Sequence, residues 1–210
     1  PEAPVPIVSI HNQERRLGGA ANVALNIKAM GATPILCAVI GDDDRKEDFI
    51  DLLTEENLSD IGILIDPSRL TTVKTRIISD RQQLLRVDEE IDNMLLPETE
   101  HSFNQQISDL LKTGNIDAVI FQDYDKGTLT PTLIRSVVKI ARKSGIPVLA
   151  DPKHRNFFEY EKVKLFKPNF REFIRGINVK IAKSDYGKIY DVVKTYLHTQ
   201  QGIEIVMITL

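Results

Sequence analysis

The spacing of apolar residues along the chain alternates between two patterns, and these patterns predict the secondary structure. From residue 18 onward, short apolar runs alternate with longer stretches in which apolar residues recur every three or four positions. Such runs are typical of buried strands, and the longer stretches are typical of helices that cover them. We therefore expect a mostly parallel α/β sheet with helices on both faces. The predicted strands span 33–40, 117–121, 146–150, 163–166 and 205–210, and the predicted helices span 45–57 and 131–144, with others beginning near 18, 169 and 185.

Two regions interrupt this alternation. The first residues are punctuated by prolines and read as extended chain, whereas 71–79 and 82–88 alternate with a period of two around the turn-prone pair Asp80-Arg81. A period of two on both sides of a turn predicts a pair of antiparallel strands. The resulting division assigns residues 1–16 and 61–91 to a small β flap, and residues 17–60 and 92–210 to an α/β core.

Composition excludes several classes of protein. With 42% hydrophobic and 27% charged residues and a net charge of −3, the chain has no basic footprint for a nucleic-acid partner. No apolar run reaches the length of a membrane span and no signal peptide is evident, so we expect no membrane partner and a cytoplasmic location. The single cysteine, Cys37, lies in an apolar run and the four histidines are scattered, so neither a disulfide nor a structural zinc site is expected.

Both ends of the chain lead us to expect a truncated protein. The chain opens at Pro1 in a proline-rich segment without an initiator methionine, and it closes on the apolar run 205–210. A parallel strand needs further crossovers to cover it. A domain that ended at this run would therefore be incomplete.

A glycine pair opens the first predicted helix. Gly18 and Gly19 would let a ligand approach the backbone, and the start of a helix offers free N–H donors. Asn22 and Asn26 lie one turn apart among alanine and leucine, so we expect both to be at least partly buried and to need hydrogen-bond partners. The alternative is a helix of small residues that packs tightly on a sheet and satisfies its asparagines internally.

Three successive predicted strands are each followed by polar residues. Asp123 and Lys126 follow the strand 117–121, Lys153 follows the next strand, and Asn169 and Glu172 follow the third. Carboxyl ends of parallel strands meet at one edge of a sheet, where ligands of open α/β sheets usually bind. We expect these side chains to converge there.

Two interpretations of this edge remain open. Asn169 and Glu172 lie at a helix start and suit a hydrated magnesium ion that carries nucleotide phosphates, but the same spacing is that of a helix capping box. Lys126 and Lys153 could bind phosphate as point charges, although surface lysines often bind nothing.

The flap adds a second group of cations. Lys74 and Arg76 fall on one face of its first strand, and Arg86 shares a face of the second strand with Asp88. The arginines could bind an anionic substrate beneath a closing flap. The alternative for them is cross-strand pairing with Asp88 or Glu90.

Taken in order, these motifs resemble the ribokinase-like carbohydrate kinases, and among them the heptose-7-phosphate kinase domain of ADP-heptose synthesis. The resemblance covers essentially the whole chain, and the ordered set is far more specific than any one motif. The matching segments are Pro1–Pro6, Gly18–Asn26, Thr72–Arg76, Gln82–Asp88, Asp123–Gly127, Asp151–Lys153 and Pro168–Glu172. Departures from the group's pattern occur at Leu17, Gln122, His154 and Lys167. They leave the exact sugar open.

The resemblance implies roles for individual residues. It implies ATP as the phosphoryl donor and Mg²⁺, supported by Glu172 through water, as the metal. The implied sugar-phosphate ligands are Gly18, Gly19, Asn22, Lys74, Arg76, Arg86 and Asp123, and the implied nucleotide-phosphate ligands are Lys126, Lys153, Asn169, Phe170, Arg171 and Glu172. The family's Gly-Ala-Gly-Asp segment, which carries the catalytic base, does not occur here, so the base is expected after Leu210 and these 210 residues alone are expected to be inactive.

The hypothesis that follows is a sugar kinase. The resemblance implies transfer of the γ-phosphoryl group of ATP to the anomeric hydroxyl of D-glycero-D-manno-heptose 7-phosphate, in the pathway to the lipopolysaccharide core. An exposed flap edge would suit a homodimer. The alternatives are a related kinase for ribose, fructose or a nucleoside, and a non-catalytic sugar- or nucleotide-binding module on the same fold.

Overall fold

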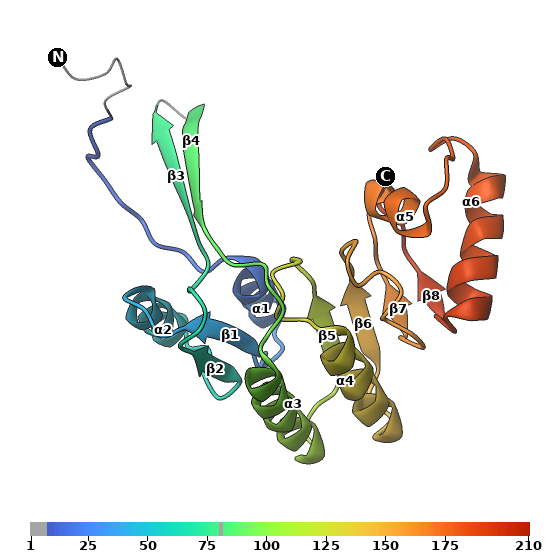
Figure 1. Cartoon of the computed structure of the whole chain (residues 1–210), viewed down its shortest axis with the longest axis horizontal. Helices are drawn as coiled ribbons and strands as arrows, with labels where there is room; N and C mark the ends of the chain where they lie inside the picture. The colour runs from blue at the N-terminus through green and yellow to red at the C-terminus, as the bar shows by residue number, and fades with distance from the viewer. Residues whose placement is uncertain (1–7, 80–81) are drawn as a thin grey trace.

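The computed structural model describes residues 8–79 and 82–210, and within them the strands form three separate sheets. The largest sheet, here called the central sheet, is parallel, has the strand order β5-β6-β7-β8 and runs from the middle of the molecule toward the right in Figure 1. A parallel pair, β1-β2, and an antiparallel pair, β3-β4, make up the other two. The strands are β1 Ala38–Gly41, β2 Ile63–Asp66, β3 Val73–Ser79, β4 Gln82–Glu89, β5 Val119–Gln122, β6 Val148–Asp151, β7 Leu165–Phe166 and β8 Ile205–Val206.

Helices connect the parallel strands, as the sequence pattern predicts. Helices α3 and α4 pack against each other on one side of the central sheet, whereas α1 and α5 begin near the carboxyl ends of β5 and β7 (Figure 1). The helices are α1 Gly19–Ala29, α2 Arg45–Glu55, α3 Pro97–Lys112, α4 Pro131–Lys143, α5 Phe170–Ile177 and α6 Tyr186–Val192, which continues as the π-helix η1 Val193–Gln200. The predicted α/β fold class with an antiparallel flap is confirmed.

Helix α4 shows how local sequence produces this architecture. Thr130 caps the helix, since its side-chain oxygen accepts a hydrogen bond of 3.1 Å from the backbone N–H of Leu133. Pro131 occupies the first helical turn, where its missing N–H costs no hydrogen bond. Leu133, Val137 and Ala141 recur at helical spacing and are essentially inaccessible to solvent. The predicted helix is therefore confirmed in both its start and its buried face.

The main hydrophobic core lies around the central sheet. Phe166, Phe173 and Tyr160 have no exposed surface and join residues from α3, α4 and η1 in one cluster. Phe157 packs edge-on against Phe166 with ring centroids 5.1 Å apart. A second, smaller cluster lies between α1, α2 and β1. Elements that end at the edge of the central sheet thus rest on a large core.

The flap differs from the rest of the molecule because β3 and β4 project away from the body (Figure 1). No residue of either strand is buried. Cross-strand pairing puts Ile77 opposite Leu85. Val87 is two residues from Leu85 on the same strand and therefore lies on the same face. Leu85 and Val87 are 51% and 44% exposed. This face is an unpartnered apolar surface within the described chain.

Several elements differ from the sequence-based expectations. Strand β2 lies within the range assigned to the flap but pairs in parallel with β1, so the antiparallel pair begins only at Val73. Helix α3 was not predicted, although Pro97 at its start and the spacing of Phe103 and Leu111 are helical signals. Residues 8–16 contain no strand, and the predicted turn at Asp80-Arg81 lies outside the described residues. In the described part of the chain, no helix has both the length and the apolar character that a membrane crossing requires.

Candidate functional site

The glycine pair lies where α1 begins. Gly18 is the N-cap in extended conformation, and Gly19 has a φ of +55°, which only glycine adopts without strain. A Cβ at Gly19 would stand 3.6 Å from the ring of Tyr124, which follows β5. The helix start therefore lies beside the loop after β5, and Gly18 has no side chain that would restrict access to it.

The expectation that Asn22 and Asn26 are partly buried is wrong, since both are exposed. Helix α1 buries only Ala21 and Ala24, against the smaller hydrophobic cluster, so its opposite side faces solvent. The assignment of Asn22 to a sugar site stays a prediction, and its amide is open to a ligand.

Asp123, at the end of β5, is 1% exposed and has protein partners on both carboxylate oxygens. Its Oδ1 accepts a hydrogen bond of 2.7 Å from the N–H of Asp125, and its Oδ2 accepts one of 2.8 Å from the hydroxyl of Tyr160. Asn156 is 3.4 Å from the same Oδ2. Asp123 thus fixes the loop that carries Lys126. Its predicted contact with sugar stays a prediction.

Tyr160 shows how strongly this carboxylate acts on its surroundings. Burial of the phenol, together with the negative charge of Asp123, raises the pKa of Tyr160 far above its ordinary value. The hydroxyl therefore remains protonated and donates its hydrogen bond at any physiological pH. No pattern in the sequence marks Tyr160 as a partner of Asp123, because the two are 37 positions apart.

Lys153 and Glu172 meet at the edge of the central sheet, as the convergence of strand ends predicts. Glu172 Oε1 forms an ion pair with Lys153 Nζ. Glu172 Oε2 accepts a hydrogen bond of 2.8 Å from the N–H of Asn169, and Asn169 Oδ1 accepts one of 2.9 Å from the N–H of Glu172. The capping box is therefore present. Beside it, Lys167 lies 2.8 Å from Asp151, which ends β6.

The charge of Lys153 is stabilised by this arrangement. Burial alone would lower the pKa of the ammonium group, but the hydrogen bond to Glu172 and the charges of Glu172, Asp151 and Asp123 outweigh it and raise the pKa. Lys153 is thus a fixed positive charge at the carboxyl end of β6. A fixed cation beside a helix start is suited to a phosphate group.

Two predicted nucleotide ligands next to this pair have contrasting environments. Arg171 is exposed on the first turn of α5. Phe170 is 9% exposed and packs in the core beside Phe173, with Lys183 5.7 Å above its ring. Its backbone N–H donates to the carbonyl oxygen of Thr209 at 2.8 Å. The roles of both residues stay predictions.

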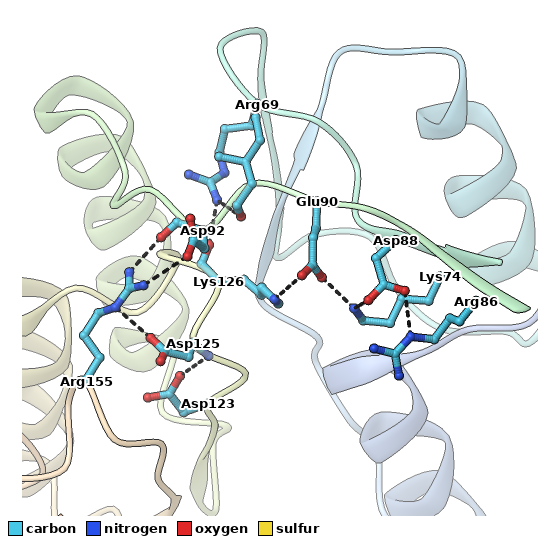
Figure 2. Close-up of polar contacts among 11 residues, drawn as sticks. Arg69, Lys74, Arg86, Asp88, Glu90, Asp92, Asp123, Asp125, Lys126 and Arg155 are labelled. Atoms are coloured by element: carbon cyan, nitrogen blue, oxygen red, sulfur yellow. Dashed lines mark hydrogen bonds and ion pairs between the residues drawn. The ribbon is translucent and has the colours of Figure 1, made fainter. Parts of the chain in front are cut away.

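A chain of alternating charges connects the flap to the loop after β5, as Figure 2 shows. Glu90 lies 2.5 Å from Lys126 and 2.6 Å from Lys74. Asp88 lies 2.9 Å from Lys74 and 2.9 Å from Arg86. Hydrogen bonds from Lys126 and Lys74 hold the pKa of Glu90 below its usual range. Arg86 therefore pairs with Asp88, but within β4 and not across the strands as the alternative interpretation expected.

Arg76 has a different environment from the other cations of the flap. It is exposed, and it lies directly opposite Arg86 in the register of β3 and β4. Two guanidinium side chains therefore lie on one face of the flap. Among the described residues, no carboxylate lies within ion-pair distance of Arg76. The charged face of the flap therefore retains a cation that is available to an anion.

Two arginines that sequence reasoning missed hold the base of the flap in place. The guanidinium of Arg69 donates to the carbonyl oxygens of Asn93, Ile91 and Lys126 at 2.8, 3.3 and 2.7 Å. Arg155 lies 2.8 Å from Asp125 and donates to the carbonyl oxygen of Asp92 at 2.7 Å (Figure 2). Their partners are far away in sequence, and most are backbone atoms, so no motif could have revealed them.

The donor set limits how a magnesium ion could bind. Both oxygens of Glu172 already have partners, and residues 8–79 and 82–210 contain no cluster of three or more acidic, histidine or cysteine side chains suited to a metal. A carboxylate oxygen keeps a further lone pair for a water molecule. The residues therefore fit a hydrated ion held mainly by nucleotide phosphates, and they do not fit direct coordination by the protein.

The fold and the site together define a class of protein. A parallel α/β core with a cation-bearing edge at the carboxyl ends of its strands and an antiparallel flap beside that edge is the architecture of ribokinase-like sugar kinases. The tetrameric inhibited form of phosphofructokinase-2 from Escherichia coli superposes with a TM-score of 0.67 and 16% identity, over 96% of this chain and 67% of that one. A possible 1-phosphofructokinase from Thermotoga maritima superposes with a TM-score of 0.63 and 13% identity, over 96% and 66% of the two chains.

Sequence comparison gives the family. The model of the pfkB family of carbohydrate kinases matches residues 2–210, and the chain belongs to this family. The chain is 38% identical over 181 residues to the Bifunctional protein HldE of Helicobacter pylori strain J99. The aligned region covers 86% of this chain and 39% of that protein. It is also 38% identical over 183 residues to the protein of the same name from Caulobacter sp. strain K31, at 85% and 36% coverage. The chain thus spans about two fifths of the length of these relatives.

Proposed function

We propose that the protein containing this chain is a kinase that transfers the γ-phosphoryl group of ATP to the anomeric hydroxyl of D-glycero-D-manno-heptose 7-phosphate. The observation that carries the proposal is the placement of cations on two sides of one edge. Lys153 lies at the carboxyl end of β6, and Lys126, Lys74, Arg76 and Arg86 lie on the loop after β5 and on the flap. Both the resemblance to heptose-7-phosphate kinases and the similarity to Bifunctional protein HldE support this substrate.

The proposed roles divide the site between donor and acceptor. Lys153, Lys126 and the start of α5 hold the nucleotide phosphates, with Glu172 supporting hydrated magnesium through water. The start of α1 and the arginines of the flap hold the sugar phosphate. The bound Mg²⁺ would neutralise phosphate charge in the transition state. Transfer forms a bond between the anomeric oxygen and the γ-phosphorus and breaks the bond to the β–γ bridging oxygen, and the hydroxyl proton passes to a base that we place after Leu210.

Positioning and charge stabilisation account for most of the catalysis of phosphoryl transfer. A flap that closed over the edge would exclude water and limit hydrolysis of ATP.

We further propose that the apolar face of the flap packs against a second copy of the chain to form a homodimer. We also propose that the protein acts in the cytoplasm.

A second candidate substrate class is a phosphorylated hexose. The solved structures that superpose on this chain include a phosphofructokinase-2 described in complex with fructose-6-phosphate, with 17% identity and a TM-score of 0.67. At this identity the likeness shows the fold alone. It justifies including fructose 6-phosphate in any substrate panel. If the protein phosphorylates no sugar in the panel, the result would favour the alternative of a non-catalytic binding module.

The test is a kinase assay of the full-length protein with a panel of sugars, in which heptose 7-phosphate is expected to be the best substrate. Arg76→Ala should raise the KM for heptose 7-phosphate about tenfold, because a charged hydrogen bond to its phosphate is lost. The KM for unphosphorylated heptose should change much less. Arg142→Ala, on the exposed outer face of α4, is the matched control. Equal changes with both sugars would contradict the role of Arg76, and turnover of fructose 6-phosphate alone would contradict the substrate.

A further inference from the structure

Glu90 lies at the centre of the charge chain in Figure 2 and has two partners from different parts of the fold. Its Oε1 lies 2.5 Å from Nζ of Lys126, in the loop after β5, and its Oε2 lies 2.6 Å from Nζ of Lys74, on β3. Glu90 itself follows the last residue of β4. One carboxylate therefore connects both strands of the flap to the edge of the central sheet.

Among the described residues, Glu90 is the carboxylate that both lysines contact, and Lys74 also pairs with Asp88. Both carry a positive charge, and their ammonium groups share a single anionic partner through its separate oxygens. The side chains of Glu90, Lys74 and Lys126 are 24%, 34% and 30% exposed, so solvent screens the pairs less than it screens fully exposed pairs. Removing the charge of Glu90 would leave Lys126 without this partner, and Lys74 with Asp88 alone.

The backbone around Glu90 is held by other groups. Arg69 donates to the carbonyl oxygens of Ile91 and Asn93, and the N–H of Leu95 donates to the carbonyl oxygen of Gly127 at 3.2 Å. The segment that leaves the flap is therefore fixed to the loop after β5 without the side chain of Glu90. What remains for the carboxylate is to hold the two lysines.

We propose that Glu90 is a positioning residue of the kinase site, which aligns the ammonium groups of Lys74 and Lys126 so that the flap and the β5 loop present them together to phosphate groups. This inference rests on the proposed function for the use of the lysines, but the bridge itself does not depend on it. In this role Glu90 contacts the lysines and not the reacting atoms.

The chain offers a matched control in Glu89, the neighbouring residue. Side-chain directions alternate along a strand, so Glu89 points to the opposite face from the residues on either side of it. Its nearest cation is Arg45, at 3.9 Å, and the two side chains are 49% and 46% exposed. Glu89→Gln removes the same charge from the same segment without touching Lys74 or Lys126.

The bridge is tested first, by residue-specific acetylation of lysines with an N-hydroxysuccinimide ester, read by mass spectrometry on the full-length protein. Glu90→Gln should raise the labelling rate of Lys126 several-fold, because Lys126 loses its anionic partner. The rate at Lys74 should rise less, because Lys74 keeps Asp88 at 2.9 Å. The rates at Lys139, on the exposed side of α4, should not change, and Glu89→Gln should behave as wild type. Unchanged rates at both bridge lysines in Glu90→Gln would overturn the proposal.

The use of the bridge is tested by comparing the rate of sugar phosphorylation with the amount of folded protein in the same preparation. Glu90→Gln should lower sugar phosphorylation about tenfold per folded molecule, because the misplaced lysines no longer present their charges together to the phosphate groups, and Glu90→Asp should restore part of the rate. A merely structural role would lower the rate only in proportion to the loss of folded protein, measured from the amplitude of thermal unfolding by circular dichroism, and that result would overturn the proposal. If wild type phosphorylated no sugar in the panel, the proposed function would fail, while the labelling experiment would still decide the bridge.

Discussion

The start of α5 and the base of the flap carry the same chemistry on very different supports. In each, a glutamate pairs with a lysine at the edge of the central sheet, as Glu172 with Lys153 and Glu90 with Lys126. Helix α5 rests on Phe173, which has no exposed surface. The strands of the flap contain no buried residue. The first pair is therefore placed by a hydrophobic core, and the second by polar contacts alone.

This difference indicates how the two sides of the site move. Regions with few buried apolar contacts open at a lower free energy than core elements do. We expect the edge at α5 to keep its geometry and the flap to open and close around its fixed base. A kinase needs both properties, since substrates must enter and water must then be excluded.

The largest predicted effect concerns the contact that fixes the base of the flap. Gly127 has a φ of +77°, and a Cβ at this position would overlap the backbone carbonyl of Asn93. The clash would be with backbone atoms, which cannot move away as the end of a flexible side chain could. Gly127→Ala should therefore lower the free energy of unfolding by about 3 kcal/mol. Urea denaturation followed by circular dichroism measures this change.

Gly114 provides the control for this prediction. It has a φ of +78°, but a Cβ there would meet no atom within 4 Å. Gly114→Ala carries only the conformational cost, about 1 kcal/mol. Equal destabilisation by the two variants would show that the close approach of Gly127 to Asn93 contributes nothing.

The next effect concerns the exposed side of the flap. Leu85→Ser removes an apolar side chain that is 51% exposed from the face proposed to pair with a second copy. We expect the dimer dissociation constant to rise about tenfold, because apolar area at the interface is lost. Sedimentation equilibrium measures it. Leu96→Ser, at a leucine that is 52% exposed before α3, should leave it unchanged, and an equal effect would disprove the assignment of the interface.

The smallest effect concerns acid. Asp43 Oδ2 accepts a hydrogen bond of 2.6 Å from the N–H of Thr71, where the chain enters the flap. Burial opposes the charge of Asp43, but hydrogen bonds from Thr71 and Arg45 outweigh it and hold the pKa below the usual value. A carboxyl group with a lowered pKa stabilises the fold above the ordinary value near 4 and loses this contribution as the pH falls through the folded-state pKa.

Asp43→Asn should therefore cost about 1 kcal/mol at pH 7, the net size of one typical hydrogen bond, and less at pH 3. Denaturation curves between these pH values measure the difference. Loss of the same free energy at both pH values would mean that the charge of Asp43 is not responsible.

Much of the core and of its edge follows from local sequence. Thr130-Pro131 predicts the start of α4, and parallel strand ends bring Lys153 and Glu172 together. The burial of Asn22 could not be predicted, because it depends on whether another element covers that side of α1. Nor could the partners of Arg69, since any backbone carbonyl is an equivalent acceptor and only the tertiary fold selects three of them.

The choice of carbonyl acceptors by Arg69 has a consequence for how this protein can change in evolution. A carbonyl oxygen is the same whichever side chain its residue carries, so these hydrogen bonds do not depend on the side chains of Ile91, Asn93 and Lys126. The side chain of Lys126 is constrained separately, by its ion pair with Glu90. Arg69 itself cannot be replaced in the same way. A lysine at this position would have a single side-chain nitrogen and could not reach the three carbonyl oxygens that the guanidinium group contacts. Arg69 thus carries the sequence constraint for these three hydrogen bonds, and the side chains at the acceptor positions can change without loss of them.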